Sequence, residues 1–243
     1  MNQWVLALVV LAAATMGLSI AHAEPGSQKT PVVVSESEQT DHPATTATAN
    51  QPEVVVKPAT IDGYRSARFG MTEAEVKKAI REDFGADDST RVTNDAERTN
   101  VLVVSGKTLI TGTPPAVVSY IFGASSSKLI QVNIVWGEGG GADAKQIVPA
   151  TNALVAYFLD RGSYRKENQV VNQPLPDGTF LAFRGADAWG HMVILHLAPA
   201  PDPNQVKKKV KDKAPELKKA VLRLSYIENP INPDVFHIEK GAF

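Results

Sequence analysis

The side chains that could carry acid–base or metal chemistry are few and scattered. His191 and His196 lie five positions apart in an expected strand, so they point to opposite faces of a sheet and cannot bind one metal ion together. We therefore predict neither a metal site nor a cofactor. Acid–base catalysis needs titratable groups in a shared cleft, and the set from which such a site could be assembled is Asp187, His191 and Glu228.

Two short motifs resemble catalytic or phosphate-binding loops but lack their partners. Ser125–Ser127 has neither the G-x-S-x-G setting of a hydrolase nucleophile nor a neighbouring base. Gly137–Gly141 could offer backbone N–H groups to an anion, but Glu138 and Asp143 would repel a phosphate. We predict no catalytic residue in either motif and interpret the glycines as a flexible connection between a strand and a helix.

A run of positive charge is the most distinctive binding feature of the sequence. It lies between Pro203 and a strand expected at Val221 and is predicted to form an exposed loop or short helix. Such a loop can dock on anionic lipid, lipopolysaccharide, peptidoglycan or an acidic protein surface, and the alternative is a solvated turn whose charge prevents aggregation. The lysines that we assign to binding are Lys207, Lys208, Lys209, Lys211 and Lys213.

Three aromatic side chains are candidate contact residues if they are exposed, because exposed aromatic residues are enriched in binding sites. They are Trp136, Trp189 and Tyr226, and Trp189 is the one that we assign to binding together with the lysines. Nucleic acid is not an expected partner, because the lysine run has no interleaved aromatic residues and the formal net charge is −1.

The N-terminus predicts export. An apolar run from Trp4 to Ile20 precedes the small-x-small triplet Ala21-His22-Ala23, which is the pattern of a secretory signal peptide cleaved after Ala23. We therefore expect a periplasmic or secreted protein with no stable transmembrane span after cleavage. The first three residues carry no Lys or Arg, so an uncleaved N-terminal anchor is the alternative.

Composition divides the rest of the chain. Residues 24–60 are rich in Thr, Ala, Ser, Pro and Glu and are predicted to form a disordered linker. Residues 61–228 are predicted to form one domain, and residues 229–243 a C-terminal tail. The sequence contains no cysteine, which excludes disulfides, thiol catalysis and thiolate metal sites. An ordinary hydrophobic core must therefore stabilise the domain.

Local patterns predict an alternation of helices and strands. Thr72 with Glu75 forms a capping box, and Gly85 is placed to end the helix, which predicts a helix over Glu73–Phe84. A second helix is expected over Ala142–Arg161, beginning or kinking at Pro149. The strands are expected at Val101–Val104, Val117–Phe122, Leu129–Trp136, Phe180–Arg184, His191–Leu197 and Val221–Ile227.

The order of these elements predicts an α+β fold. Ile130, Val132, Ile134 and Trp136 alternate with Gln131 and Asn133, so one face of that strand is expected to be buried and the other largely wet, as in antiparallel sheets. The order helix, three strands, helix, three strands indicates two tandem units over about 61–137 and 138–228, which form one helix-on-sheet domain.

The segment Phe69–Val76, F-G-M-T-x-x-E-V before a short helix and a strand meander, resembles the opening of small envelope proteins of the SmpA/OmlA (BamE) group. Those proteins share the folding unit of the β-lactamase inhibitor protein, so the resemblance implies a helix packed on an antiparallel sheet and a role in outer-membrane assembly. It transfers no functional residue, and the lipid-anchoring cysteine usual in BamE-type proteins is missing here.

These observations favour a non-enzymatic, secreted or periplasmic interaction module that binds an envelope protein or an anionic component of the envelope. Inhibition of a secreted enzyme is a special case of that hypothesis. The alternative is an envelope hydrolase with a dispersed active site built from Asp187, His191 and Glu228. Convergence of these three side chains in a pocket favours the hydrolase, whereas an exposed aromatic patch beside the lysines favours the binding module.

Overall fold

The computed structural model describes residues 57–162, 164–200 and 217–238. The predicted signal peptide, linker residues 24–56 and the lysine run lie outside the described residues. Within the described part, the domain begins before the predicted boundary at residue 61, because Ala59 is already buried in the hydrophobic core. The tail is described up to Ile238 and contacts the domain, since the backbone N–H of Ala124 donates to the carbonyl oxygen of Asp234.

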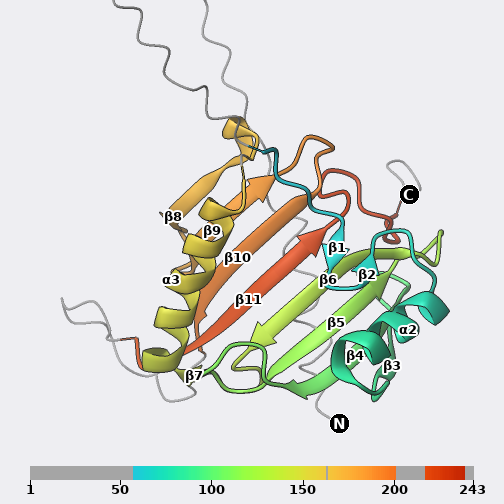
Figure 1. Ribbon diagram of the computed structural model, residues 1–243, viewed down its shortest axis with the longest axis horizontal. Helices are drawn as coiled ribbons and strands as arrows, with labels where there is room; N and C mark the ends of the chain where they lie inside the picture. The colour runs from blue at the N-terminus through green and yellow to red at the C-terminus, as the bar shows by residue number, and fades with distance from the viewer. Residues whose placement is uncertain (1–56, 163, 201–216, 239–243) are drawn as a thin grey trace, which may run out of the picture. The chain divides into compact units, whose positions relative to one another are not determined.

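One large antiparallel sheet dominates the fold (Figure 1), and all its strand pairs among the described residues are antiparallel. Its strand order is β3-β4-β5-β6-β11-β10-β9-β8, and the short strand β7 pairs with the start of β11. The bounds are β3 Thr90–Asn94, β4 Thr99–Lys107, β5 Ala116–Phe122, β6 Leu129–Trp136, β7 Ala142–Asp143, β8 Val170–Pro174, β9 Phe180–Ala186, β10 Met192–Pro199 and β11 Lys219–Ile227.

The α+β class is confirmed, but each helix is followed by four main strands of this sheet instead of the expected three. Helix α2 (Glu73–Phe84) precedes β3 to β6, and helix α3 (Ala144–Asp160) precedes β8 to β11. The two main strands that sequence patterns missed, β3 and β8, are the outermost strands of the sheet order. Their segments TRVTN and VVNQP are largely exposed, so they lack the apolar alternation that reveals a half-buried strand.

Helix α2 has the predicted bounds and termini. The Thr72 side chain accepts from the backbone N–H of Glu75, whose carboxylate accepts in return from the N–H of Thr72, so the capping box is complete. Gly85 closes the helix with a left-handed φ of 81°. Val76, Ala79 and Ile80 form its buried face.

Helix α3 begins at Ala144, five residues before Pro149, so the prediction that the helix could begin at the proline is wrong. Asp143 caps it by accepting from the N–H of Lys145. Pro149 is the sixth residue of the helix, so it has no N–H to donate to the carbonyl oxygen of Lys145, and the helix continues through it to Asp160. None of the helices in the described part of the chain has the length and apolarity that a membrane crossing requires.

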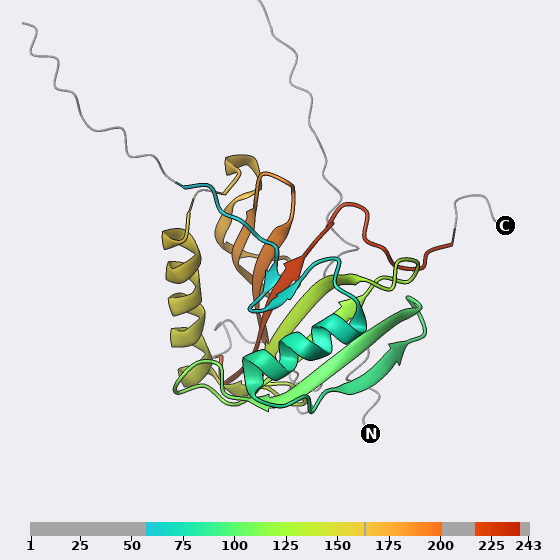
Figure 2. The same cartoon turned by 45° about the vertical axis from the view of Figure 1, so that its right-hand side comes forward.

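Both helices lie on the same face of the sheet, and the small hairpin of β1 (Gly63–Tyr64) and β2 (Ala67–Arg68) lies between them over the sheet centre (Figures 1 and 2). The sheet twists strongly, so that its two halves diverge in the rotated view of Figure 2. The main core fills the space between this face and the helices, and Trp136 and Tyr120 are among its largest fully buried side chains.

The opposite face of the sheet differs from its prediction. Asn133 was expected on a largely wet face, but it is only 2% exposed. It lies between Ser119 of β5 and Ser225 of β11 in the strand register, and both serines are buried too. The Asn133 side chain accepts a hydrogen bond of 2.8 Å from the amide of Gln131. A polar row therefore crosses the middle of this face.

The pairing of β6 with β11 joins the two halves of the sheet. Trp136 lies opposite Leu222, Ile134 opposite Leu224 and Val132 opposite Tyr226. Because side chains alternate between faces, this register places all six on the helix-covered face. The centre of the sheet thus presents a continuous apolar and aromatic surface under the hairpin and α3.

A substitution at the first helix cap tests the local account of α2. Thr72→Ala removes both the side-chain acceptor for Glu75 N–H and one donor to the Glu75 carboxylate, and we expect it to lower the free energy of unfolding by about 1 kcal/mol. Urea denaturation measures this difference. Lys78→Ala, at an exposed position of the same helix, is the control and is expected to change stability by less than about 0.5 kcal/mol. Equal effects of the two variants would contradict the capping assignment.

Candidate functional site

A cleft of about 380 Å³ lies on the helix-covered face, between α3 and the β1–β2 hairpin. We call it the aromatic cleft. Its floor comes from the centre of the sheet, one wall from α3, the other from the segment 60–68, and two residues of the β4–β5 connection complete its lining. The residues that carry its chemistry are Tyr64, Arg65, Trp136, Tyr157, Phe158, Arg161, Tyr164 and Tyr226.

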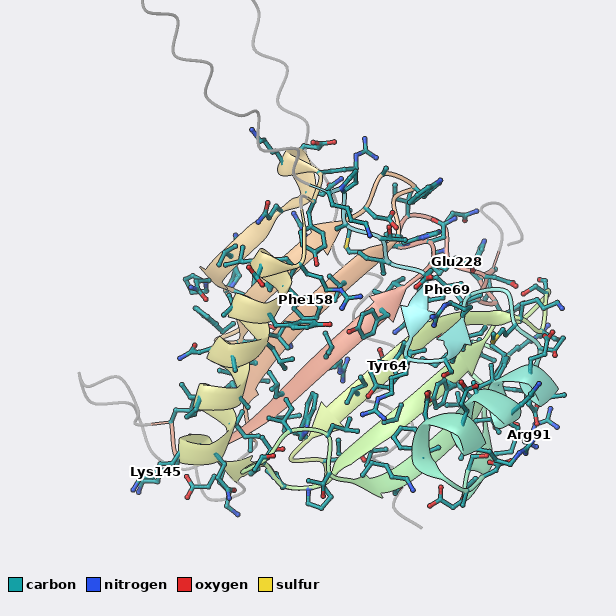
Figure 3. All side chains as sticks on the ribbon, in the orientation of Figure 1. Tyr64, Phe69, Arg91, Lys145, Phe158 and Glu228 are labelled. Carbon is teal, nitrogen blue, oxygen red and sulfur yellow. The ribbon has the colours of Figure 1, made fainter. Side chains whose placement is uncertain are left out.

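Aromatic rings connect the two walls across the floor. The ring centroid of Tyr226 on β11 lies 5.8 Å from that of Tyr64 on β1 and 6.5 Å from that of Phe158 on α3. Phe158 also stacks on Phe183 at 5.3 Å, and Tyr164 meets Phe183 edge-on at 5.2 Å. Figure 3 labels Phe158 and Tyr64 on either side of β11. Tyr64, Phe158, Tyr164 and Tyr226 line the cleft, whereas Phe183 is fully buried and supports the rings from outside its lining.

A glycine makes room for the last ring of this row. A Cβ atom at Gly185 on β9 would lie only 2.6 Å from the ring of Tyr164. Real Cβ atoms do not approach other heavy atoms this closely, so any larger residue would displace the tyrosine. Gly185 is thus required for the end of the aromatic row next to α3.

Two arginines on opposite walls provide the positive charge of the cleft. Arg65 donates to the carbonyl oxygen of Asp83 and lies over the rings of Tyr64 and Phe84. Arg161 hydrogen-bonds the hydroxyl of Tyr157, one helical turn earlier on α3, and lies over its ring. Within the described residues neither guanidinium forms a salt bridge with a carboxylate. Both charges are thus available to an anion.

Three tyrosine hydroxyls of the cleft stay protonated at neutral pH. Burial raises the pKa of Tyr164 to about 12 and also raises the pKa of Tyr64 and Tyr226 above the ordinary value. Trp136 is 1% exposed, lines the floor, and its Nε1–H has no hydrogen-bond partner among the described residues. The polar groups of the cleft are therefore mainly hydrogen-bond donors and cations, the complement of an acceptor-rich, anionic ligand.

The segment that forms one wall is held by a buried carboxylate and a histidine. Asp187 accepts from the backbone N–H of Ile61 at 3.0 Å, and Nδ1 of His191 donates to the carbonyl oxygen of the same residue at 2.7 Å. His191 Nδ1 is also 3.3 Å from the Asp187 carboxylate, whose side chain is fully buried. Both backbone groups of Ile61 are thus fixed to the β9–β10 turn. We call this the Ile61 clamp.

A second hollow, of about 460 Å³, lies beside the clamp at the end of β11. We call it the Trp189 groove; it is lined by residues 189–191, 228–232 and 234. His191 and Glu228 both line it, whereas Asp187 is buried outside its lining and contacts His191, so two of the three residues of the hydrolase hypothesis share this hollow. However, Asp187 also accepts from the N–H groups of Trp189 and His191 at 3.0 Å each. The carboxylate oxygens of Asp187 therefore mainly accept hydrogen bonds from backbone N–H groups.

The predicted contact residues have different outcomes. Trp189 is 70% exposed, as its binding assignment requires. Trp136 was a candidate only if exposed, and that condition is not met because it is 1% exposed and packs into the core under the cleft; Tyr226 is half-buried in the cleft floor. The binding lysines Lys207, Lys208, Lys209, Lys211 and Lys213 lie outside the described residues. In the described part of the chain, no group of three or more acidic or histidine side chains is arranged to hold a metal ion.

Sequence reasoning missed the two arginines of the cleft. The available signals were the Tyr64-Arg65 pair directly after Gly63 and the four-residue spacing of Tyr157 and Arg161, which places them on one side of a helix. Neither signal is specific, because the two pairs come together only when α3 and the hairpin pack on the same face of the sheet.

Comparisons with protein-family models, with curated proteins and with solved structures found no match to this chain. The function must therefore be argued from the geometry of the cleft and the groove.

Removal of the clamp carboxylate tests its role. Asp187→Ala leaves the N–H groups of Ile61, Trp189 and His191 without their acceptor, so we expect a loss of at least about 2 kcal/mol of stability and faster amide exchange at residues 59–64. Hydrogen exchange and denaturation measure both. Asp177→Ala, which removes a turn carboxylate that accepts from Thr179 in an exposed loop, is the matched control. Unchanged exchange at Ile61 in Asp187→Ala would contradict the clamp.

Proposed function

We propose that this protein is a non-enzymatic binding module of the periplasmic or secreted space, and that its aromatic cleft takes an anionic component of the cell envelope. The observation that carries the proposal is the pair of arginines on opposite walls of one aromatic cleft, with no carboxylate partner among the described residues. A charged group at such a site retains its attraction for an anion because no internal ion pair neutralises it.

The cleft suits a ligand with an apolar body and an acceptor-rich head. The rings of Tyr64, Phe158 and Tyr226 cover an apolar body from three sides, while the guanidinium groups meet an anionic head at the rim. The volume of about 380 Å³ falls within the range of about 300–1,000 Å³ that is typical of small-molecule sites. We therefore propose an anionic amphiphile as the ligand.

The lining of the cleft favours binding over catalysis. Among the described residues, Asp62 is the only carboxylate in it, and it forms a salt bridge of 3.2 Å with Arg68. Burial raises the pKa of Tyr64, Tyr164 and Tyr226 further above neutral pH, so these hydroxyls do not act as bases. No histidine of the described part of the chain lines the cleft, so neither of the usual general bases is free there.

The envelope hydrolase stays the second candidate function, because His191 and Glu228 line the Trp189 groove and Asp187 contacts His191. Asp187 and His191 already have a structural role, because both form hydrogen bonds with the backbone of Ile61. In the described ranges of the chain, the groove lining contains no serine, threonine, cysteine or lysine that could act as a covalent nucleophile. We therefore prefer the binding module.

We also propose that the two halves of the domain are tandem copies of one helix-plus-strand unit. The order α2, β3 to β6 matches the order α3, β8 to β11, and the last strands of the two halves pair with each other. Element order supports this proposal. The resemblance to the SmpA/OmlA (BamE) group is supported by element order and by the short motif before α2.

The cleft proposal is tested with dodecanoate as the probe and its uncharged methyl ester as the ligand control. We expect Arg65→Gln and Arg161→Gln each to weaken dodecanoate binding about tenfold, equivalent to about 1.4 kcal/mol, because each removes a charge-assisted hydrogen bond. Isothermal titration calorimetry measures the affinities. Arg91→Gln, which removes an exposed arginine paired with Glu73, is the matched control and is expected to change nothing.

Two outcomes would contradict this assignment. Equal affinity for dodecanoate and its methyl ester would show that the arginines do not recognise charge. Equal weakening by Arg91→Gln would show that the anion responds to the overall charge of the protein and not to the cleft.

The proposed location is tested by N-terminal sequencing of the protein from cells that export it. Cleavage after Ala23 is expected to leave Glu24 as the first residue, and Ala23→Lys is expected to block processing because signal peptidase needs a small side chain there. Thr60→Lys, in the described part of the domain, is the control for the added charge. Recovery of the wild-type chain from the membrane fraction with Met1 or Asn2 at its N-terminus would support the uncleaved anchor instead.

A further inference from the structure

The Trp189 groove carries a second inference, which does not depend on the aromatic cleft because the two linings share no residue. The groove lies where β11 ends, a position that Figure 3 marks with the label of Glu228. One side is the β9–β10 turn with Trp189, and the other is the chain that leaves β11, including Ile231, which is 94% exposed.

The turn presents the indole of Trp189 rigidly. Its backbone is fixed from both sides, since the N–H groups of Trp189 and His191 donate to Asp187 Oδ1 and that of Gly190 donates to the Asp187 carbonyl oxygen. Gly190 has a φ of 90°, a conformation that a residue with a side chain rarely adopts. The indole thus stays in solvent on an ordered turn, which lowers the entropic cost of using it as a binding anchor.

The rest of the groove is negatively charged. Glu228 is half-buried, and no hydrogen bond or salt bridge joins its carboxylate to another described residue. Asp234 is held in place by the N–H groups of Ser125 and Ser126. Among the residues that the structure describes, no lysine or arginine lines the groove. A carboxylate that is partly withdrawn from water and lacks a cation attracts one strongly.

A neutral His191 ring does not offset the negative charge of Glu228. Its Nδ1 hydrogen is committed to the carbonyl oxygen of Ile61, which can only accept, so the neutral ring directs no second N–H at Glu228. Partial burial raises the pKa of Glu228, proximity to Asp234 raises it further, and His191 lowers it. The carboxylate therefore gains from the arrival of an external cation.

We propose that the Trp189 groove binds a lysine- or arginine-bearing peptide segment of a partner protein, with the cationic head between the indole of Trp189 and the carboxylate of Glu228. An aromatic face and a carboxylate that contact the same cationic group both stabilise an ammonium or guanidinium ion. Pro230 and Ile231 supply the apolar contact that the aliphatic stem of such a side chain requires.

The test uses the processed protein, residues 24–243, with acetylated and amidated pentalysine as the probe and pentaglutamine as the neutral control. Trp189→Ala and Glu228→Gln are each expected to weaken pentalysine binding about fivefold to tenfold, measured by calorimetry at low salt. Trp189→Phe keeps an aromatic face and is expected to retain most of the affinity. Because Trp189 is exposed, its substitution leaves the core intact, which circular dichroism and thermal unfolding verify.

Two controls separate the groove from general electrostatics and from the cleft. Glu82→Gln removes an exposed carboxylate of α2 that lies outside the groove and is expected to leave the affinity unchanged. Arg161→Gln alters the aromatic cleft and is also expected to leave pentalysine binding unchanged, so failure of the cleft proposal and failure of the groove proposal give different results.

Three results would overturn the proposal. Unchanged affinity in both Trp189→Ala and Glu228→Gln places the peptide elsewhere. Equal binding of pentalysine and pentaglutamine, or an equal loss in Glu82→Gln, shows that the groove does not select a cation. Cleavage of the peptide that disappears in His191→Gln assigns the groove to the hydrolase function instead.

Discussion

The antiparallel pairing of β6 with β11 is the interaction on which the rest of the domain depends. It joins the last strand of each half, although about 80 residues separate them in the chain. Its register places Trp136, Ile134, Leu224 and Tyr226 on the face that the helices cover. A shift of one residue would turn all these side chains to the other face and remove the floor of the aromatic cleft.

The walls of the cleft are held by two different kinds of contact. On one side, Phe158 fixes α3 by stacking on Phe183 and meeting Tyr226, so the helix position depends on aromatic packing. On the other side, the segment around Ile61 is held by hydrogen bonds from its backbone to Asp187 and His191. Packing is tolerant of small displacements, whereas the buried hydrogen bonds fix one register of this segment.

The two candidate sites have opposite charge and share one structural element. The cleft presents Arg65 and Arg161, while the groove presents Glu228 and Asp234. Asp187 links them, because it holds the wall of the cleft through Ile61 and the turn of the groove through Trp189. A protein with nearly balanced formal charge can in this way present an anion site and a cation site at once, since each depends on local fields and not on net charge.

Much of the local structure could be predicted because its causes are local. The ends of α2 depend on Thr72, Glu75 and Gly85, which lie close to the helix in sequence. Apolar alternation predicts the central strands. Edge strands β3 and β8 could not be predicted, because exposed residues carry no such pattern. The cap at Asp143, and not Pro149, marks the start of α3, because the proline lies inside the helix.

The sequence by itself determined the class of fold, the first helix with its caps, the central strands and the exclusion of all cysteine chemistry. Only the tertiary structure decided that Trp136 is buried while Trp189 is exposed, since both are simply aromatic residues near strands. It also decided that Arg65 and Arg161 share a cleft, and that Asp187 and His191 meet Ile61 across more than 120 residues. These contacts follow from strand order and register, which depend on the packing of the whole sheet and not on neighbours in the chain.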